Sequence, residues 1–271
     1  MINNHICYFY GVRIPFVKYQ GAGNDFVIFD AWKHAVELSE TAIAMLCDRH
    51  FGIGADGLML IRKMNGFDFE MVYYNSDGKT GSMCGNGGRC LVDFAVVSGL
   101  VKGPDIRFLA SDGPHEAVVL GPGSIRLRMI DVDEIARLDE GYLLNTGSPH
   151  FIRCVDDLHG IDVTAEGRKT RFSERFKDDG VNVNFMEWKD GLLHVRTYER
   201  GVEAETLSCG TGVTAAALLA HRLGITDGQT TCGVSTQGGL LNVSFDPVGD
   251  GFRNVWLEGP AKFVFKGEIE L

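Results

Sequence analysis

The stretch SMCGNG at residues 82–87 is repeated as LSCGTG at residues 207–212, and each copy holds a cysteine followed by Gly-x-Gly. Cys209 lies 125 positions after Cys84, and the apolar run behind each cysteine ends at a glycine with the same spacing. Such constant spacing indicates an internal duplication. We therefore predict that the 271-residue chain contains two similar domains, each with one thiol at the start of a helix.

Both cysteines precede a helix-compatible apolar run, residues 89–98 in the first half and 213–223 in the second. A helix that is apolar on nearly every side is buried on nearly every side. Strand-like runs follow both helices, at residues 106–110, 116–120, 125–130, 230–236, 240–245 and 254–257. A helix surrounded by strands, occurring twice, predicts an α+β architecture rather than alternating βαβ units, with the boundary near residues 129–133.

The composition is that of a globular protein, and its charge makes a small zwitterionic or polar ligand easier to accommodate than a polyanion. The net charge of −10 and the lack of a basic stripe argue against nucleic acid and anionic membranes as partners. No run reaches the length of a bilayer span, and residues 1–10 lack the basic and apolar segments of a secretory signal. Seven scattered cysteines are typical of a reducing compartment, so we predict a cytoplasmic protein.

The position of the two thiols favours acid–base chemistry. At the first turn of a helix, unpaired N–H groups and the macrodipole favour thiolate over thiol. This effect lowers the ordinary cysteine pKa of about 8.5 by roughly 1.5 units, which predicts a value near neutrality. The glycines beside Cys84 and Cys209 let a ligand approach the backbone, so a carboxylate could dock on both helix N-termini.

Seven motifs spread over nearly the whole chain resemble, in their order, those of the diaminopimelate epimerase family. They are Gly23-Asn24-Asp25-Phe26, Asn75-Ser76-Asp77-Gly78, Met83-Cys84-Gly85-Asn86-Gly87, Pro149-His150, Asn182-Val183-Asn184-Phe185, Tyr198-Glu199-Arg200-Gly201 and Cys209-Gly210-Thr211-Gly212. About the first dozen residues lie outside this pattern. The resemblance implies an isomerase of lysine and peptidoglycan precursor biosynthesis that interconverts LL- and meso-diaminopimelate, without pyridoxal phosphate or any other cofactor. We also expect no metal site, because no two cysteines have the close spacing of a zinc knuckle and no histidine pair is adjacent to them.

The same resemblance implies a more detailed fold. Each of two pseudo-symmetric domains is expected to be a mixed, barrel-like sheet around a central helix, with a cleft between the domains. The C-terminal residues are expected to return to the first domain, which gives residues 1–129 plus 263–271 and residues 130–262. A homodimer is also implied, with Phe265 at a position where relatives often carry a tyrosine at the dimer contact.

The resemblance assigns roles to individual residues. Cys84 and Cys209 are the catalytic pair, in which a thiolate removes the α-proton on one face and a thiol delivers a proton on the other. Without a cofactor, backbone N–H groups must hold the reacting carboxylate and stabilise the developing charge. These N–H groups belong to Gly85, Asn86, Gly210 and Thr211. The family assigns thiol tuning to His150 and Glu199, and substrate recognition to Glu199, Arg200, Asn24, Asn75 and Asn182.

Two positions depart from the family pattern. Gly57 stands where many relatives carry glutamine, and Ser148 stands where many carry asparagine, so two polar contacts are expected to be shorter or absent. The other five cysteines are expected to be small buried apolar residues rather than ligands or nucleophiles. They are Cys7, Cys47, Cys90, Cys154 and Cys232.

Three other functions stay open on the sequence alone. A proline or hydroxyproline racemase of the same superfamily also pairs two cysteines, although Asn86 and the run Tyr198-Glu199-Arg200-Gly201 favour diaminopimelate. A thiol redox protein would use the two cysteines to form a disulfide across a cleft. A non-catalytic amino-acid-binding module would bind ligand without proton exchange.

Overall fold

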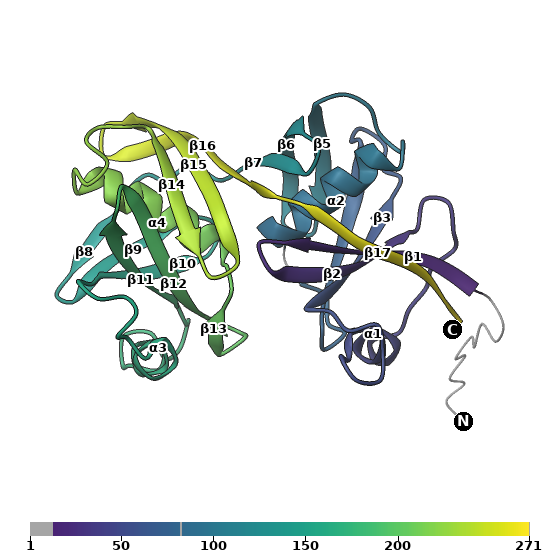
Figure 1. Ribbon diagram of the computed structural model, residues 1–271, viewed down its shortest axis with the longest axis horizontal. Coiled ribbons are helices and arrows are strands. Elements are labelled where there is room, and N and C mark those ends of the chain that lie inside the picture. The colour runs from purple at the N-terminus through teal and green to yellow at the C-terminus, as the bar shows by residue number, and fades with distance from the viewer. Residues whose placement is uncertain (1–12, 82, 271) are drawn as a thin grey trace.

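A computed structural model of the chain describes residues 13–81 and 83–270. The chain forms two lobes, each with a helix packed against curved strands (Figure 1). The predicted N-terminal extension and Cys7 lie outside the described residues. In the part of the chain that is described, no helix is long and apolar enough to span a membrane.

The first lobe contains most of the N-terminal half together with the last strand. Its elements are β1 (Arg13–Gly21), β2 (Asn24–Asp30), α1 (Glu40–Cys47), β3 (Gly57–Arg62), β4 (Phe69–Asn75), α2 (Gly85–Val97), β5 (Asp105–Ala110), β6 (Gly113–Gly121), β7 (Ser124–Arg128) and β17 (Lys262–Glu270). Strand β17 runs from the second lobe back across the first (Figure 1) and pairs antiparallel with β1.

The second lobe is continuous in sequence. Its elements are β8 (Ala136–Leu138), β9 (Gly141–Asn145), β10 (Pro149–Cys154), α3 (Val163–Arg171), β11 (Asn182–Lys189), β12 (Leu192–Glu199), β13 (Ala204–Thr206), α4 (Gly210–Arg222), β14 (Thr231–Thr236), β15 (Gly239–Val248) and β16 (Gly251–Pro260). Strand β16 pairs with β15 of this lobe and with β7 of the first lobe. The two lobes are therefore joined through backbone hydrogen bonds.

The order of strand pairing is the same in both lobes. In the first lobe, β1–β2 is antiparallel, β2–β3 parallel, β3–β4 antiparallel and β4–β5 parallel. In the second lobe, β9–β10, β10–β11, β11–β12 and β12–β14 repeat this sequence of directions. Helices α2 and α4 have 13 residues each and occupy the same place in the order. The predicted α+β class is confirmed, and the exact domain limits stay a prediction.

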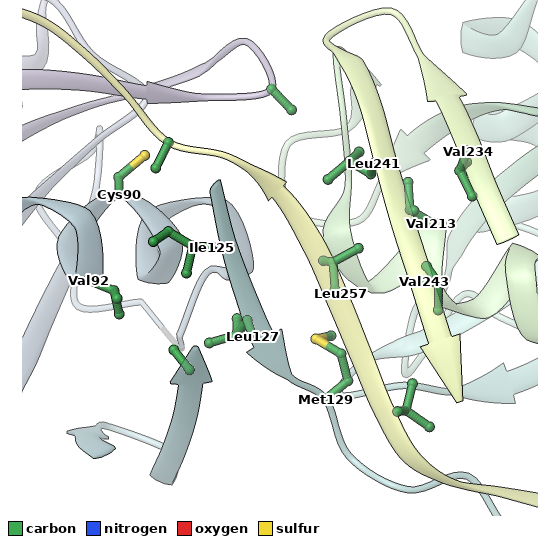
Figure 2. Packing of buried hydrophobic residues seen from close by; sticks show 14 of the residues in the cluster. Cys90, Val92, Ile125, Leu127, Met129, Val213, Val234, Leu241, Val243 and Leu257 are labelled. Atoms are coloured by element: carbon green, nitrogen blue, oxygen red, sulfur yellow. The ribbon is translucent and has the colours of Figure 1, made fainter. Parts of the chain in front are cut away.

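One apolar core extends through both lobes and lies behind the starts of α2 and α4. Leu127 of β7 and Leu257 of β16 are opposite each other in register and fully buried. They connect the side chains around α2, such as Val92, with those around α4, such as Val213 (Figure 2). A Cβ built on Gly85 would lie 3.8 Å from Leu127 and 3.9 Å from Leu257. This shared core fixes the positions of the two helix N-termini relative to each other.

The remaining cysteines agree with the sequence prediction except at one position. Cys47, Cys90 and Cys232 are buried, as expected for small apolar side chains. Cys154 is exposed at the end of β10, so the prediction that it is buried was wrong. Residues at strand ends alternate between core and solvent, and the sequence does not show which phase Cys154 takes.

Candidate active site

Cys84 and Cys209 are the residues that begin the two central helices. Each occupies the N-cap position, with extended backbone angles of φ −97° and ψ 121° at Cys84 and φ −111° and ψ 110° at Cys209. Their thiols are therefore near the unpaired N–H groups of the first helical turn. The Asn86 Nδ2 group donates to the carbonyl oxygen of Ser208 at 3.1 Å, which ties the start of α2 to the residue before Cys209. The two thiols thus belong to one site.

The environment of the thiols opposes ionisation more than the sequence suggests. Burial raises the pKa of Cys84, while the N–H groups of Gly87 and Asn86 lower it. Burial also raises the pKa of Cys209 well above its ordinary value, and the nearby Glu199 carboxyl adds to this effect. The predicted pKa near neutrality was wrong for this arrangement, because loss of water outweighs the field of the helix N-terminus.

The surroundings of Cys209 form a chain of hydrogen bonds. Thr211 Oγ1 lies 3.4 Å from Cys209 Sγ and 2.9 Å from His150 Nε2. On the other side of the ring, Asn184 Nδ2 lies 3.0 Å from His150 Nδ1. Thr197 completes the chain, since its hydroxyl donates to Asn184 Oδ1 at 2.9 Å. We refer to Thr197, Asn184, His150 and Thr211 as the Cys209 relay.

Cys84 has a different partner. Its thiol lies 3.5 Å from Asn24 Oδ1, and the Asn24 Nδ2 group donates to Asp56 Oδ2 at 2.7 Å. Asp56 is in turn paired with Arg49, whose guanidinium is 2.7 Å from Asp56 Oδ1. The predicted residue Asn24 is therefore in direct contact with one of the predicted catalytic thiols.

Glu199 lies close enough to influence both thiols. Burial raises the pKa of its carboxyl group, which also accepts a hydrogen bond from Thr206 Oγ1 at 3.0 Å. Its charge raises the pKa of Cys84 and of Cys209. The tuning role predicted for Glu199 is thus compatible with its location, in the direction that keeps the thiols protonated.

Arg89 supports the start of α2 from inside the protein. It is fully buried, and its guanidinium donates to Asn86 Oδ1 at 2.8 Å and to the carbonyl oxygens of Gly85 and Pro260 at 3.4 Å. The Asn86 amide is therefore oriented with its oxygen toward Arg89 and its Nδ2 group toward the second lobe. Arg89 was not among the predicted site residues, although a charged side chain at the start of a helix expected to be buried was a visible signal.

The structure brings most of the predicted binding residues to this site. Asn182 is buried, and its Oδ1 accepts from the backbone N–H of Arg200 at 2.9 Å. The Arg200 guanidinium is exposed and donates to the carbonyl oxygen of Asp179 at 2.7 Å rather than to the thiol networks. Asn75 is exposed at the end of β4, opposite Gly57. Arg200 and Asn75 thus lie at the periphery of the site.

The two departures from the family pattern have different surroundings. Ser148 makes polar contacts of its own, with its Oγ 3.0 Å from His150 Nε2 and 3.2 Å from Thr211 Oγ1, and a shorter or absent contact relative to asparagine stays a prediction there. At Gly57 a Cβ would lie 2.6 Å from the Tyr73 ring, so the ring occupies the space of a longer side chain. The Tyr73 hydroxyl would lie 2.9 Å from the same Cβ, and the expected shorter or absent polar contact at Gly57 stays a prediction.

His150 is neutral in the folded protein, which predicts a pH dependence of stability. Burial lowers its pKa to about 3, against an ordinary value of about 6.5. Between these values the unfolded chain binds a proton and the folded chain does not, so the free energy of unfolding falls as the pH drops from about 6.5 toward 3. We expect His150→Gln to flatten this slope in urea titrations at several pH values. An unchanged slope would contradict the neutral, buried imidazole.

Solved structures with the same two-lobed fold define the class of the protein. The chain matches a phenazine biosynthesis protein of the PhzF family from Bacillus anthracis with a TM-score of 0.74 and 14% identity, covering 96% of this chain and 100% of that one. It matches a hydroxyproline epimerase from Agrobacterium vitis with a TM-score of 0.67 and 14% identity, covering 96% and 93%. The chain therefore has the duplicated α+β fold that these proteins share.

Sequence similarity defines the family within this class. The family profile described as diaminopimelate epimerase matches residues 16–130 and 142–264. A protein named diaminopimelate epimerase from Flavobacterium psychrophilum is 46% identical over 254 residues, 93% of this chain and 98% of its own. Its namesake from Chlorobaculum tepidum is 42% identical over 258 residues, 93% and 99% of the two chains. The chain belongs to the diaminopimelate epimerase family, and the predicted resemblance is confirmed.

Proposed function

We propose that this protein is an isomerase that epimerises LL-diaminopimelate to meso-diaminopimelate without a cofactor, by proton transfer between Cys84 and Cys209. One observation carries this proposal: each of the two duplicated helices has a cysteine at its N-cap. The starts of the two helices are joined by the hydrogen bond from Asn86 to Ser208. The names of the relatives support diaminopimelate over proline or hydroxyproline as the substrate.

The reaction needs a base and an acid on opposite faces of the α-carbon. In one direction the thiolate of one cysteine removes the α-proton and the thiol of the other donates its proton to the opposite face. The roles reverse in the other direction. Each turnover leaves the pair with one proton, so no external acid or base is consumed.

The helix N-termini supply the stabilisation that a cofactor would otherwise give. N–H groups of Gly85 and Asn86 on α2, and of Gly210 and Thr211 on α4, are unpaired within their helices and suit the reacting carboxylate. Donors aimed at developing charge in a site that excludes water are each worth about 3 kcal/mol of barrier. The burial around the thiols provides such an environment.

The distal end of the substrate carries a second carboxylate and ammonium group. Arg200 is suited to the carboxylate, because the residue is exposed while its backbone N–H is held by the buried Asn182. Asn24, Asn75 and Glu199 supply oxygen acceptors for ammonium groups. We propose that substrate binding moves the Arg200 side chain away from Asp179.

Isotope exchange tests the proposal directly. The reduced protein is incubated with LL-diaminopimelate in deuterated water, and we expect deuterium at the α-carbon together with meso product. If the α-proton of proline or hydroxyproline is exchanged and that of diaminopimelate is not, the protein is a proline or hydroxyproline racemase instead. Binding of diaminopimelate without exchange would contradict an enzymatic function.

We further propose a cytoplasmic homodimer that contacts its partner through β17. Phe263, Val264 and Phe265 are consecutive in β17, and each residue is exposed to 44% or more. Among the described residues β17 pairs on one side, with β1. A consecutive exposed apolar run beside a free strand edge is typical of an interface.

Phe265→Glu is expected to shift the protein toward monomer in sedimentation experiments at micromolar concentration, because it places a charge in this apolar run. Phe51→Glu is the matched control, since Phe51 is exposed to 86% and lies outside β17. A dimer that survives Phe265→Glu with unchanged affinity would exclude this surface.

A further inference from the structure

Tyr73 is a polar residue near the Cys84 thiol that the proposed mechanism does not use. It lies in β4, opposite Met59 of β3 in the antiparallel register. Met59 Sδ and Met71 Cε lie 3.0 Å and 3.5 Å from a Cβ built on Gly87, so this face of the sheet carries α2. Tyr73 is two residues after Met71 in the same strand and shares that face. Its ring therefore points toward the helix that Cys84 begins.

The ring of Tyr73 fits between two glycines. A Cβ at Gly57 would lie 2.6 Å from its Cε2 and 2.9 Å from its Oη. A Cβ at Gly81 would lie 2.6 Å from Cδ1 and 2.7 Å from Cε1, on the other edge of the ring. Phe26 packs edge-on against the same ring, with the two centroids 6.2 Å apart. These contacts give the ring one position and place its hydroxyl beside Gly57.

The Tyr73 hydroxyl is neutral and open to a ligand. Burial raises its pKa, and the nearby Cys84, Glu199 and Asp56 add to this effect. The residue is half-buried, and within residues 13–81 and 83–270 its hydroxyl has no hydrogen-bond partner. A hydroxyl that loses water without gaining a partner loses stabilisation. A bound substrate group would supply the missing partner.

The charge of the surroundings selects the substrate group that this hydroxyl can bind. The carboxyl groups of Asp56 and Glu199 and the thiol of Cys84 all act against a further negative charge beside the ring. Both carboxylates of the proposed substrate already have donors, in the N–H groups of the helix starts and in Arg200. Its ammonium groups are attracted by acidic surroundings, and a phenol oxygen accepts a hydrogen bond from N–H. An ammonium group is therefore the fitting partner.

We propose that the Tyr73 hydroxyl binds an ammonium group of the substrate and that Tyr73 is a specificity-determining residue of this enzyme. The inference rests on the proposed function and adds to it a contact from β4 on the Cys84 side of the site. It assigns to Gly57 and Gly81 the role of leaving room for the phenol ring. The contact selects ligands that carry an amino group at this place.

Tyr73→Phe tests the contact, because it removes one oxygen atom and leaves the ring in place. Epimerisation of LL-diaminopimelate is measured over a range of substrate concentrations. We expect KM to rise at least about tenfold, the effect of losing a hydrogen bond to a charged group, and kcat to stay within about threefold. The contact holds the substrate equally before and during proton transfer, so it contributes to binding rather than to the chemical step. An unchanged KM would overturn the proposal.

Tyr74→Phe is the matched control. Tyr74 is the next residue of β4, lies opposite Leu58 in register and packs on the other face of the sheet, in a different apolar cluster from that of α2. It loses the same atom as Tyr73→Phe but is turned away from the site, so we expect its KM and kcat to equal those of the unmodified protein. An equal rise of KM in both variants would attribute the effect to the strand as a whole and would overturn the assignment to the Tyr73 hydroxyl.

Calorimetric titration with three ligands identifies the group that the hydroxyl binds. Diaminopimelate has two amino groups, 2-aminopimelate lacks the distal one and pimelate lacks both, while all three keep two carboxylates. We expect Tyr73→Phe to weaken diaminopimelate binding about tenfold and to leave pimelate binding unchanged. A weaker affinity for 2-aminopimelate as well places the contact at the reacting ammonium group, and an unchanged one places it at the distal group. An equal loss of affinity for pimelate would identify a carboxylate as the partner and overturn the proposal.

The two sets of measurements separate this inference from the proposed function. If Tyr73→Phe weakens diaminopimelate binding but the unmodified protein exchanges no α-proton in deuterated water, the proposed function fails while the contact stands. If the unmodified protein epimerises diaminopimelate and Tyr73→Phe has the same KM and the same affinity, the function stands while the role of Tyr73 fails.

Discussion

Cys84→Ala and Cys209→Ala are each expected to lower kcat for epimerisation by about 10³-fold or more. Each thiol supplies one half of a two-face proton transfer, and a positioned acid or base contributes about 10²–10⁴-fold. Loss of either one interrupts the complete reaction, since α-proton removal and redelivery need different groups. The measurement is meso product formed from LL-diaminopimelate, together with α-deuterium incorporation in deuterated water.

Matched controls for these variants lie in the same two lobes. Cys90→Ala changes a fully buried cysteine of α2 that lies six residues after Cys84, and Cys232→Ala changes a buried cysteine in β14. Both are expected to keep epimerase activity within a few-fold, at a stability cost of about 1 kcal/mol. An active Cys84→Ala or Cys209→Ala protein would show that a different group handles the proton on that face.

The overall architecture was predictable because the duplication leaves its trace in the sequence. The constant spacing of 125 residues between Cys84 and Cys209 corresponds to two helices of equal length at the same place in two similar strand orders. Apolar residues on all sides of α2 and α4 correctly predicted central helices. The spacing does not predict that β16 joins the two lobes by pairing with β7.

The electrostatics of the thiols were less predictable. The helix field depends on position in the local sequence, which can be read directly, whereas desolvation depends on residues from both lobes that close around the site. The prediction for Cys84 and Cys209 therefore included the smaller effect and omitted the larger one.

The Cys209 relay shows a further limit of sequence analysis. Asn184 and Thr197 belong to the neighbouring strands β11 and β12 and are opposite each other in register. Asn184 was part of a family motif, but its role depends on which amide atom faces His150. The orientation of this amide group depends on its neighbours in the folded protein, so it cannot be read from the motif.

Gly212→Ala is expected to be the most damaging conservative change in the second lobe's site. A Cβ at this position would lie 2.4 Å from Asn184 Oδ1 and 3.3 Å from His150 Cε1, and both groups are buried and hydrogen bonded. Overpacking of this kind costs about 1–3 kcal/mol. Displacement of Asn184 would also disturb the Cys209 relay. We expect a lower midpoint in urea unfolding and an epimerase activity reduced by more than tenfold.

Gly87→Ala is the matched comparison, because Gly87 is the counterpart of Gly212 in the first copy of the motif. Its nearest neighbour is Met59 Sδ at 3.0 Å, a flexible side chain that can shift at low cost, and Met71 Cε and Phe26 Cε1 lie at 3.5 Å, an ordinary van der Waals distance. Alanine also has the higher helix propensity by about 1 kcal/mol. The stability change at Gly87 should therefore be near zero. Equal destabilisation of the two variants would contradict the view that Asn184 and His150, rather than the helix start itself, require glycine at position 212.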